Sequence, residues 1–598
     1  MYLKNALPKE KILLALAIFL TCLQIFISMP FSIWAENQFN FGINLSSSTV
    51  IFRDFAFSLA IISFIISSVI PIKYNRTLLV GFCILAIALY IQQNILVWNY
   101  GLITGMVLDF SINNHLGYID SLLWLGATTS FFLNKRHVYK HASTILLFVT
   151  LVAGANFGFT LFNYESTNAQ AIAKPTEENK FVFSQRKNIL FFLLDGFQTD
   201  LFWDIIDKSP DLRNDLQGFT YYPNTTAVFS KTYPTIPLLL TGKTYRKQEP
   251  IKTFLENVYD ESLLTELVNN HWDVGIFPYV NGVINLSSKI ATNIRYSITN
   301  TEIAENYLNA LNFSIYRSVP HILKPLVYNK GHFIFGKKST DYLKARYTPM
   351  GYDLNKKIRK NTNYKHHAKI FLSGLTNYSG TQNDKQTFRF FHINAPHEPF
   401  TLNIDLEYGR IGDDFYAYRE YAEAINKLMT AYLQQIKNLG IYDNSMIIIA
   451  ADHGGGEYTE KRYNPKKKEF EDDAKYGHKS AAGRPLLLIK PFGAQGVMQQ
   501  SEKPLSLLDI APTIAKAAGL NSHVYEGLPI DLIDSNEKRK RIFHFYNFTG
   551  WKLKYLEDFE TYEIDGHVFD DSSWSYIGKL KHGSTTNNNK NLIPEVSN

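Results

Sequence analysis

The sequence predicts a two-part fold: five apolar helices that span a membrane, and then an α/β domain with a central, largely parallel sheet. Three observations predict it. The chain has 598 residues, which is more than one hydrophobic core usually accommodates. Apolar runs dominate residues 1–165, and short strand-like runs alternating with helical patterns follow them. We expect a transmembrane domain over 1–165, a linker over 166–186, a soluble domain over 187–545, and a C-terminal extension over 546–598 with a disordered tail.

Five apolar runs are candidates to cross a bilayer, because each approaches or exceeds the roughly 20 residues that span its hydrocarbon layer. The fourth is the weakest candidate, because it is short and contains Asp120. A cleaved signal peptide could explain only the first run, and helices buried in a soluble core stay open as an alternative. The runs are Ile12–Trp34, Phe55–Pro71, Leu78–Trp98, Leu116–Leu133 and Ala142–Phe162.

Basic residues in the loops predict the orientation of these helices. Three lysines precede the first run, Lys73 and Arg76 separate the second from the third, and three basic residues follow the fourth. The other two loops are nearly free of them, with Arg53 beside Asp54 as the exception. Short basic loops stay in the cytoplasm. We therefore expect a cytoplasmic N-terminus and, after five crossings, a soluble domain on the periplasmic or outer side of a bacterial inner membrane.

Cysteine content and charge exclude several classes of site and partner. The two cysteines, Cys22 and Cys83, both lie in predicted spans, so the soluble domain has neither a disulfide framework nor a cysteine metal site. The net charge of +7 is small for this length and includes no long basic block. It does not indicate a nucleic-acid partner.

Short apolar runs predict the strands of the soluble domain. The segment KNILFFLLDG, 187–196, ends abruptly in Asp-Gly and suits a strand that is buried on both faces. Helical patterns separate the runs, most clearly at 421–440 and 506–519. Strands that alternate with helices favour a layered domain with a largely parallel sheet. The other strand-like runs are 272–279, 387–393, 445–452 and 484–490.

Residues of the metal-binding type follow three of these runs. Asp195 ends the first, Asp452 and His453 end the fourth, and the third leads to His397. Sites in open α/β sheets form at the carboxyl ends of strands, so we expect these side chains to lie close together. His478 follows shortly afterwards in KYGHKSAAGRP. Carboxylates with imidazoles suit Zn²⁺ or Mn²⁺ better than Ca²⁺ alone, although each residue taken singly could cap a turn or lie on the surface.

The order of these segments resembles the alkaline phosphatase and sulfatase superfamily. LLDG resembles its opening metal-binding segment, NAPHEPF its Pro-His-x-Pro substrate segment, and IKNLGIYDNSMIIIAADHGGGE its helix, strand and second metal segment. SLLDIAPTIAKAAGL is similar to its late Leu-Asp-x-x-Pro-Thr helix. The matches follow the family's order and extend over about 190–530. The resemblance implies an alkaline phosphatase-like fold.

The segment SKTYPTIPLLLTG, 230–242, is where the resemblance implies a nucleophile. Family sulfatases carry Cys or Ser, then x-Pro-Ser-Arg, and then an apolar run that ends in Leu-Thr-Gly. That pattern puts Thr232 in the nucleophile position, at a helix N-terminus and on the metal. Metal coordination is one way to activate a hydroxyl, and a helix N-terminus favours an anionic substrate. From the residues alone, Ser230, Thr235 or a turn without chemistry stay open.

Three departures from the family pattern argue against sulfate-ester hydrolysis. Sulfatases make an aldehyde from Cys or Ser, which a threonine cannot supply. Ile236 stands where an arginine is expected, and Gly196 stands where a second acidic residue is expected. Threonine is instead the nucleophile in relatives that cleave or transfer phosphodiesters, which include nucleotide pyrophosphatases.

Two of those threonine groups, lipoteichoic acid synthases and phosphoethanolamine transferases, share the layout of five spans and an outer catalytic domain. The chain belongs cleanly to neither. Phosphoethanolamine transferases are typically disulfide-rich, whereas this soluble domain has no cysteine. Lipoteichoic acid synthases have a different threonine motif.

The resemblance therefore implies a metal-dependent phosphotransferase. It would move a phosphoglycerol or phosphoethanolamine head group from a membrane phospholipid to a cell-surface glycan through a phospho-threonine. A phosphodiesterase or sulfatase-like hydrolase, or a non-catalytic membrane binding protein, stays open. His397 and His478 would bind substrate or a second metal. The implied ligands of a Zn or Mn ion are Asp195, Thr232, Asp452 and His453.

Overall fold

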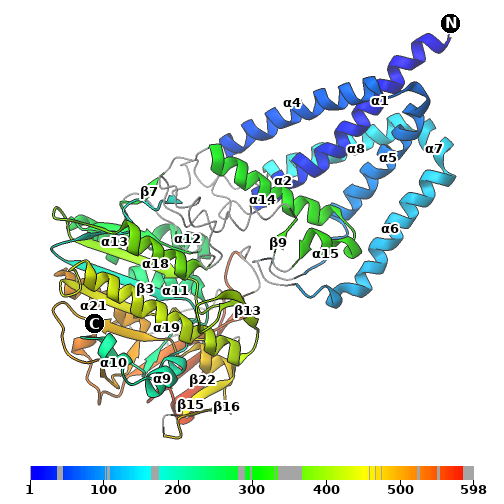
Figure 1. Cartoon of the computed structure of the whole chain (residues 1–598). Helices are drawn as coiled ribbons and strands as arrows, with labels where there is room; N and C mark the ends of the chain where they lie inside the picture. Colours follow the sequence, from blue (N-terminus) through cyan, green and yellow to red (C-terminus); the bar gives the residue numbers. More distant parts are fainter. Residues whose placement is uncertain are drawn as a thin grey trace. The chain divides into compact units, whose positions relative to one another are not determined.

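The computed structural model of the chain divides into two compact units, each described by itself below (Figure 1). The helical unit comprises residues 1–172 and 296–346, and the sheet unit comprises 173–295 and 347–598. Parts of the predicted linker and the predicted disordered tail lie outside the described residues. The structure describes residues 2–36, 45–100, 103, 108–162, 174–279, 284, 290–295, 300–329, 332–334, 366–456, 458–464, 466–472, 475–520, 525–548 and 553–582.

Four helices among the described residues are long and apolar enough to cross a membrane. The first runs over Lys9–Glu36 and combines α1 (Tyr2–Leu23), the π-helical η1 (Gln24–Ser28) and α2 (Met29–Glu36). Four of the five predicted runs thus form helices with the length and composition of a membrane span, which indicates a membrane-anchored protein. The other three are α4 (Leu45–Val69), α5 (Ile72–Asn94) and α8 (Ala142–Phe162).

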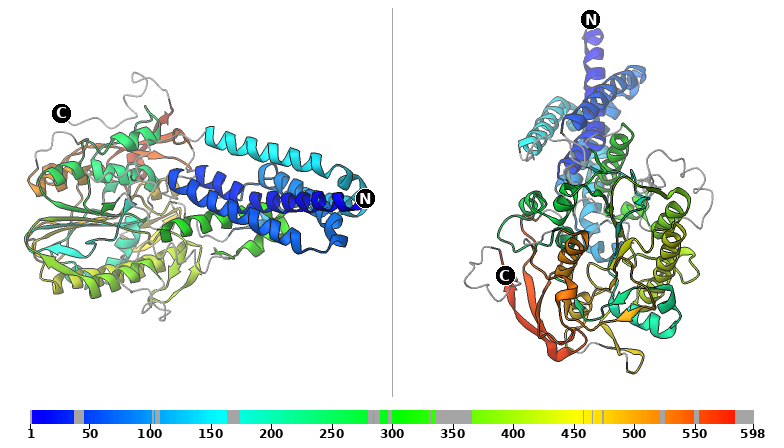
Figure 2. Two further views of the ribbon diagram at one scale, coloured as in Figure 1. Left: turned by 90° about the horizontal axis from the view of Figure 1, so that it is seen from above. Right: turned by 90° about the vertical axis from the view of Figure 1, so that its left-hand side faces the viewer.

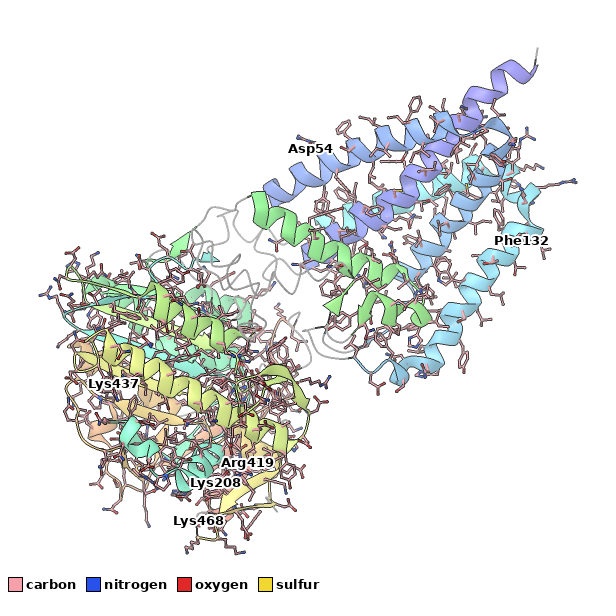
Figure 3. The ribbon with its side chains drawn as sticks, in the orientation of Figure 1. Asp54, Phe132, Lys208, Arg419, Lys437 and Lys468 are labelled. Atoms are coloured by element: carbon pink, nitrogen blue, oxygen red, sulfur yellow. The ribbon has the colours of Figure 1, made fainter. Side chains whose placement is uncertain are left out.

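The fourth predicted span forms a helix, α6 (Asn114–Leu133), but it is not one of those four. Asp120 and several other polar residues lower its hydropathy. Large apolar side chains of α6 are nevertheless exposed, among them Leu122 and Phe132 (Figure 3). A crossing by α6 therefore stays a prediction.

The helical unit also contains a segment that follows part of the sheet unit in sequence. It comprises α14 (Asn300–Ser318), the short 3₁₀ turn η4 (His321–Leu323) and α15 (Lys324–Val327). The apolar side of α14 packs on α2, where Tyr307, Ala310 and Phe313 join the cluster around Trp34. We call residues 300–334 the insertion.

A seven-stranded sheet forms the centre of the sheet unit, with strand order β18-β4-β17-β14-β3-β11-β6. The neighbours β14, β3, β11 and β6 run parallel, whereas β17 is antiparallel to both β14 and β4. The predicted largely parallel sheet is thereby confirmed, with β17 as the one antiparallel strand among these seven. The strands are β18 (Gln499–Gln500), β4 (Thr220–Tyr221), β17 (Leu487–Lys490), β14 (Ser445–Ala450), β3 (Asn188–Leu194), β11 (Thr387–Ile393) and β6 (Asp273–Phe277).

Helices cover both faces of this sheet, as Figure 2 shows in its left view. Alternate residues of β3 enter two different cores, with Phe191 in one and Phe192 in the other, as the two-residue period of a strand requires. Arg419 and Lys208 both pair with Asp204, which joins two helices on one face (Figure 3). That face carries α9 (Thr199–Lys208), α18 (His367–Tyr378) and α19 (Phe415–Asn438), and the other carries α11 (Thr232–Thr241), α12 (Ile251–Asn257), α13 (Leu263–Asn269) and α21 (Ile510–Ala518).

A three-stranded antiparallel sheet near the C-terminus packs on the α11 side of the unit. Its strands are β20 (Lys540–Phe545), β21 (Phe559–Asp565) and β22 (Trp574–Leu580). Phe543 and Trp574 enter the same core as α11. This sheet accounts for the aromatic, strand-like pattern of the C-terminal sequence.

An ion pair is buried in the central sheet. Arg389 of β11 lies opposite Gly275 of β6, where a Cβ atom would stand only 3.0 Å from the Arg389 Cδ. The guanidinium reaches Asp273, with 2.6 Å between Nη2 and Oδ2. This contact outweighs the effect of burial and lowers the pKa of Asp273. The glycine therefore gives a buried arginine the room to pair.

We expect Arg389→Leu to lower the free energy of unfolding by about 3–5 kcal/mol, because it leaves the carboxylate of Asp273 buried without its cation. Lys516→Leu is the matched control, because it removes an exposed pair with Asp531 that is worth about 0–1 kcal/mol. Urea unfolding of the detergent-solubilised full chain, followed by tryptophan fluorescence, measures both variants. Equal losses would contradict this account of the buried pair.

Candidate active site

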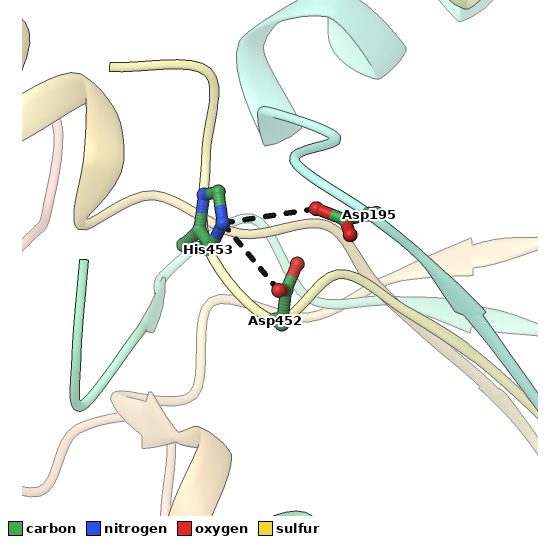
Figure 4. A group of neighbouring side chains, drawn as sticks. All are labelled: Asp195, Asp452 and His453. Atoms are coloured by element: carbon green, nitrogen blue, oxygen red, sulfur yellow. Dashed lines mark ion pairs between the residues drawn. The ribbon is translucent and has the colours of Figure 1, made fainter. Parts of the chain in front are cut away.

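Three side chains of the metal-binding type meet at the carboxyl ends of two neighbouring parallel strands. Asp195 directly follows β3, and Asp452 and His453 follow β14. All three are buried, and one ligand atom from each lies within 4.8 Å of the others. His453 Nε2 is 3.8 Å from Asp195 Oδ1 and 3.4 Å from Asp452 Oδ2 (Figure 4). The structure thus brings together three residues that the sequence singles out.

Glycines shape the backbone beside these ligands. Gly196 has φ +70°, a conformation that side chains disfavour, and its N–H donates to Asp452 Oδ1 at 3.0 Å. At Gly454 an added Cβ would lie 2.1 Å from the carbonyl oxygen of Ala481. Gly196 thus links the turn after β3 to Asp452, and Gly454 allows the backbone after His453 to pass close to Ala481.

Thr232 lies beside this cluster. Its Oγ1 is 3.5 Å from both carboxylate oxygens of Asp195. Thr232 is the first residue of α11, but Tyr233 and Pro234 have non-helical backbone angles. The regular helix therefore begins at Thr235, after Thr232, whose hydroxyl faces Asp195.

The two other candidate hydroxyls, those of Ser230 and Thr235, are engaged elsewhere. Ser230 Oγ accepts from the Tyr546 N–H at 3.1 Å and donates to the Tyr546 carbonyl at 3.3 Å, which ties the segment to the C-terminal sheet. Thr235 Oγ1 donates to the Lys231 carbonyl at 2.8 Å and is buried. Ser230 and Thr235 therefore bond to backbone, and Thr232 is the hydroxyl of the three that faces Asp195.

The donor set fits a divalent cation. Asp452 Oδ2 is buried, has no hydrogen-bond donor among the described residues, and lies 3.4 Å from His453 Nε2. Burial alone would raise the pKa of Asp195, but His397, His392 and His453 outweigh it, so this carboxyl stays ionised. Two buried carboxylates, one imidazole and a hydroxyl offer the oxygen and nitrogen ligands that Zn²⁺ and Mn²⁺ accept.

The two remaining predicted histidines occupy different places. The Cα and Cδ2 of His397 each lie 4.0 Å from the position of a Cβ at Gly196, so His397 borders the cluster. His478 begins α20 (His478–Ala482), and its Nδ1 is 3.9 Å from Glu460 Oε1. Within the described residues His478 is not part of the three-residue cluster.

Sequence reasoning missed two residues that contact or border this site. His392 is buried in β11, and its Nε2 is 3.0 Å from Asp195 Oδ2. Its signal is a histidine near the end of a buried apolar run. Lys231 directly precedes Thr232, and burial lowers the pKa of its amine to about 8, against the opposing charges of Glu398, Asp195 and Asp452. Its signal is its place next to the threonine.

Known proteins resemble this chain in sequence and in fold. The lipoteichoic acid synthase of Staphylococcus aureus (strain NCTC 8325 / PS 47) is 27% identical over 210 residues, which are 34% of this chain and 31% of the synthase. The match thus spans less than a third of that relative.

Two solved structures are similar to the chain at low identity. The lipoteichoic acid synthase LtaP of Listeria monocytogenes has a TM-score of 0.32 at 13% identity and covers 58% of this chain and 76% of its own. The C-terminal periplasmic domain of EcEptC from Escherichia coli, in complex with Zn, has a TM-score of 0.33 at 9% identity, with coverages of 68% and 95%.

The Sulfatase family profile matches residues 187–520, which is more than half of the chain. The matched range contains both strand ends, the threonine segment and the two neighbouring helical faces. The chain therefore belongs to the sulfatase family of enzymes.

Proposed function

We propose that the protein transfers a phospho-head group, phosphoglycerol or phosphoethanolamine in type, from a membrane phospholipid to a cell-surface glycan. The observation that carries the proposal is the 3.5 Å approach of Thr232 Oγ1 to both oxygens of Asp195, beside Asp452 and His453. A threonine in this position suits a phosphodiester better than a sulfate ester, because it cannot become the sulfatase aldehyde. The family relationship and the similarity to lipoteichoic acid synthase support the same class of reaction.

Thr232 is the nucleophile in this proposal. Its Oγ1 gives its hydroxyl proton to solvent water and attacks the phosphorus of the donor, and the phosphorus–oxygen bond to diacylglycerol breaks. His397 gives the departing diacylglycerol oxygen a proton, since it borders the site. A glycan hydroxyl then gives its proton to the deprotonated His397 and attacks the phosphorus of the phospho-threonine. The bond between phosphorus and Thr232 Oγ1 breaks, and Oγ1 takes a proton from water and returns to a free hydroxyl.

Asp195, Asp452 and His453 are the residues that hold a divalent metal, Zn or Mn, together with Thr232. A bound metal supplies charge neutralisation at the hydroxyl and at the phosphoryl oxygens. His392 holds the carboxylate of Asp195 through its Nε2. His397 orients the head group or holds a second ion in this proposal. His478 would do the same where it approaches the substrate.

The apolar helices keep the catalytic domain beside its lipid donor, which raises the effective concentration of the donor. We propose that α6 is the fifth crossing, because its 20 residues reach about 30 Å, the thickness of the hydrocarbon layer. Five crossings from a cytoplasmic N-terminus put the sheet unit in the periplasm or outside the cell.

Vesicles of labelled donor lipid should give the wild-type protein a mass adduct on the peptide that contains Thr232. Addition of acceptor glycan should move the label to the glycan. Thr232→Ala should abolish the adduct and lower turnover by about three orders of magnitude or more, because the nucleophile is lost. Intact mass, peptide mapping and glycan analysis measure these outcomes.

Thr430→Ala on α19 is the matched control, because it removes a threonine hydroxyl that bonds only to its own helix. Free head group in equal amounts with and without glycan would instead favour a phosphodiesterase or a sulfatase-like hydrolase. An adduct on Ser230 or Thr235 would overturn the assignment of the nucleophile. Wild-type turnover by Thr232→Ala would support a binding protein.

Topology is tested with single cysteines in a chain whose Cys22 and Cys83 are replaced by alanine. In intact cells, a membrane-impermeant maleimide should label Leu532→Cys in the sheet unit and should reach Arg136→Cys only after permeabilisation. Four crossings without α6 predict the reverse, with Arg136→Cys labelled and Leu532→Cys protected. That reversed pattern would contradict the proposed orientation.

A further inference from the structure

The insertion, residues 300–334, is bonded to the helical unit although the chain before and after it belongs to the sheet unit. Tyr307 OH donates to the Phe26 carbonyl at 2.8 Å, and Ser314 Oγ donates to the Ile25 carbonyl at 2.5 Å. Both carbonyls lie in the π-helical segment η1, where side-chain donors commonly satisfy displaced backbone groups. The insertion is therefore anchored on the first apolar helix.

A buried carboxylate ties the next part of the insertion to α6. Asp120 accepts from the His321 N–H at 2.8 Å, from Trp98 Nε1 at 2.8 Å and from Gln92 Nε2 at 3.3 Å. The His321 ring lies against Gly117, where an added Cβ would stand 2.6 Å from its Cδ2. Asp120, which lowers the hydropathy of α6, thus accepts hydrogen bonds both from the end of α5 and the chain just after it and from the insertion. The bond to the insertion positions η4 against α6.

In the short η4–α15 segment a lysine is buried and large apolar side chains are exposed, which is the opposite of the pattern on a helix that faces water. Lys324 is only 3% exposed, and its Nζ donates to the carbonyls of Tyr316 and Val319 at 2.6 and 3.1 Å. Its neighbours Ile322 and Leu326 are 73% and 66% exposed. A segment that turns its cation inward and its large apolar side chains outward suits a lipid environment.

The exposed apolar surface of η4–α15 continues onto a predicted span. η4 packs on α6, where Tyr118 and Leu122 are exposed as well. We propose that Ile322, Leu323 and Leu326 embed in the membrane at its surface, next to α6, as a monotopic lipid contact. The insertion would then hold the catalytic chain to the membrane a second time, between β6 and α18. This inference does not depend on the proposed chemistry.

The test places one fluorescent bimane label at Leu326→Cys, or at Ile322→Cys as a second site, in the full chain lacking Cys22 and Cys83. The protein is reconstituted at one copy per nanodisc of phosphatidylcholine and phosphatidylglycerol. Doxyl-labelled phosphatidylcholine should cause a loss of emission at both sites. The loss should match that at Leu122→Cys on α6, which is 67% exposed.

Leu532→Cys is the matched control, because Leu532 is 63% exposed but lies in the sheet unit, and we expect no loss there. Iodide in the buffer should quench the control and spare positions 322 and 326. Quenching of both positions by iodide alone would overturn the proposal. Protection from both quenchers would also overturn it, and would indicate that another part of the same chain covers the face.

Discussion

The parallel pairing of β14, β3 and β11 is the constraint on which the candidate active site depends. Leu193 of β3 lies opposite both Ala450 of β14 and His392 of β11. The residues that follow these strands therefore emerge at one edge of the sheet, and Asp195 meets Asp452 there. Side chains alternate along a strand, so a slip of one residue in either pairing would turn a ligand to the opposite face.

Two carboxylates are buried at that edge of the sheet, and their negative charge determines what the site can bind. The carboxylates of Asp195 and Asp452 are buried within reach of each other, and burial of an unpaired charge is costly. The ammonium group of Lys231 offsets part of this charge. We propose that a divalent cation offsets the rest and contacts Thr232, since the Thr232 hydroxyl already faces Asp195.

The sequence predicted five of the seven strands of the central sheet and the metal-binding residue types after β3 and β14, because apolar runs ending in Asp-Gly or Asp-His-Gly are local signals. It missed β4 and β18, which have only two residues each. Thr232 was implied by the resemblance to the sulfatase pattern, counted back from Thr241-Gly242. His392 was missed because a histidine inside an apolar run looks like part of the strand. Its role emerges only when the register sets it beside Asp195.

Non-local contacts account for the other gaps between sequence and structure. In the sequence, Asp120 is a carboxylate within an apolar run. Only the structure shows that it accepts a hydrogen bond from His321 of the insertion. The insertion itself has mixed composition, and no local pattern assigns residues 300–334 to the helical unit. The buried pair of Arg389 and Asp273 likewise could not be predicted locally. The room for the arginine comes from Gly275, which lies in a strand more than a hundred residues away.

The central claim is that Asp195, Asp452 and His453 clasp one divalent cation against the hydroxyl of Thr232. An anomalous difference map from crystals of the protein soaked in Mn²⁺ tests it directly. The account predicts a peak in contact with these three side chains and with Thr232 Oγ1. A map with no peak there, or with Mn²⁺ bound only at a place that excludes Thr232, would contradict it.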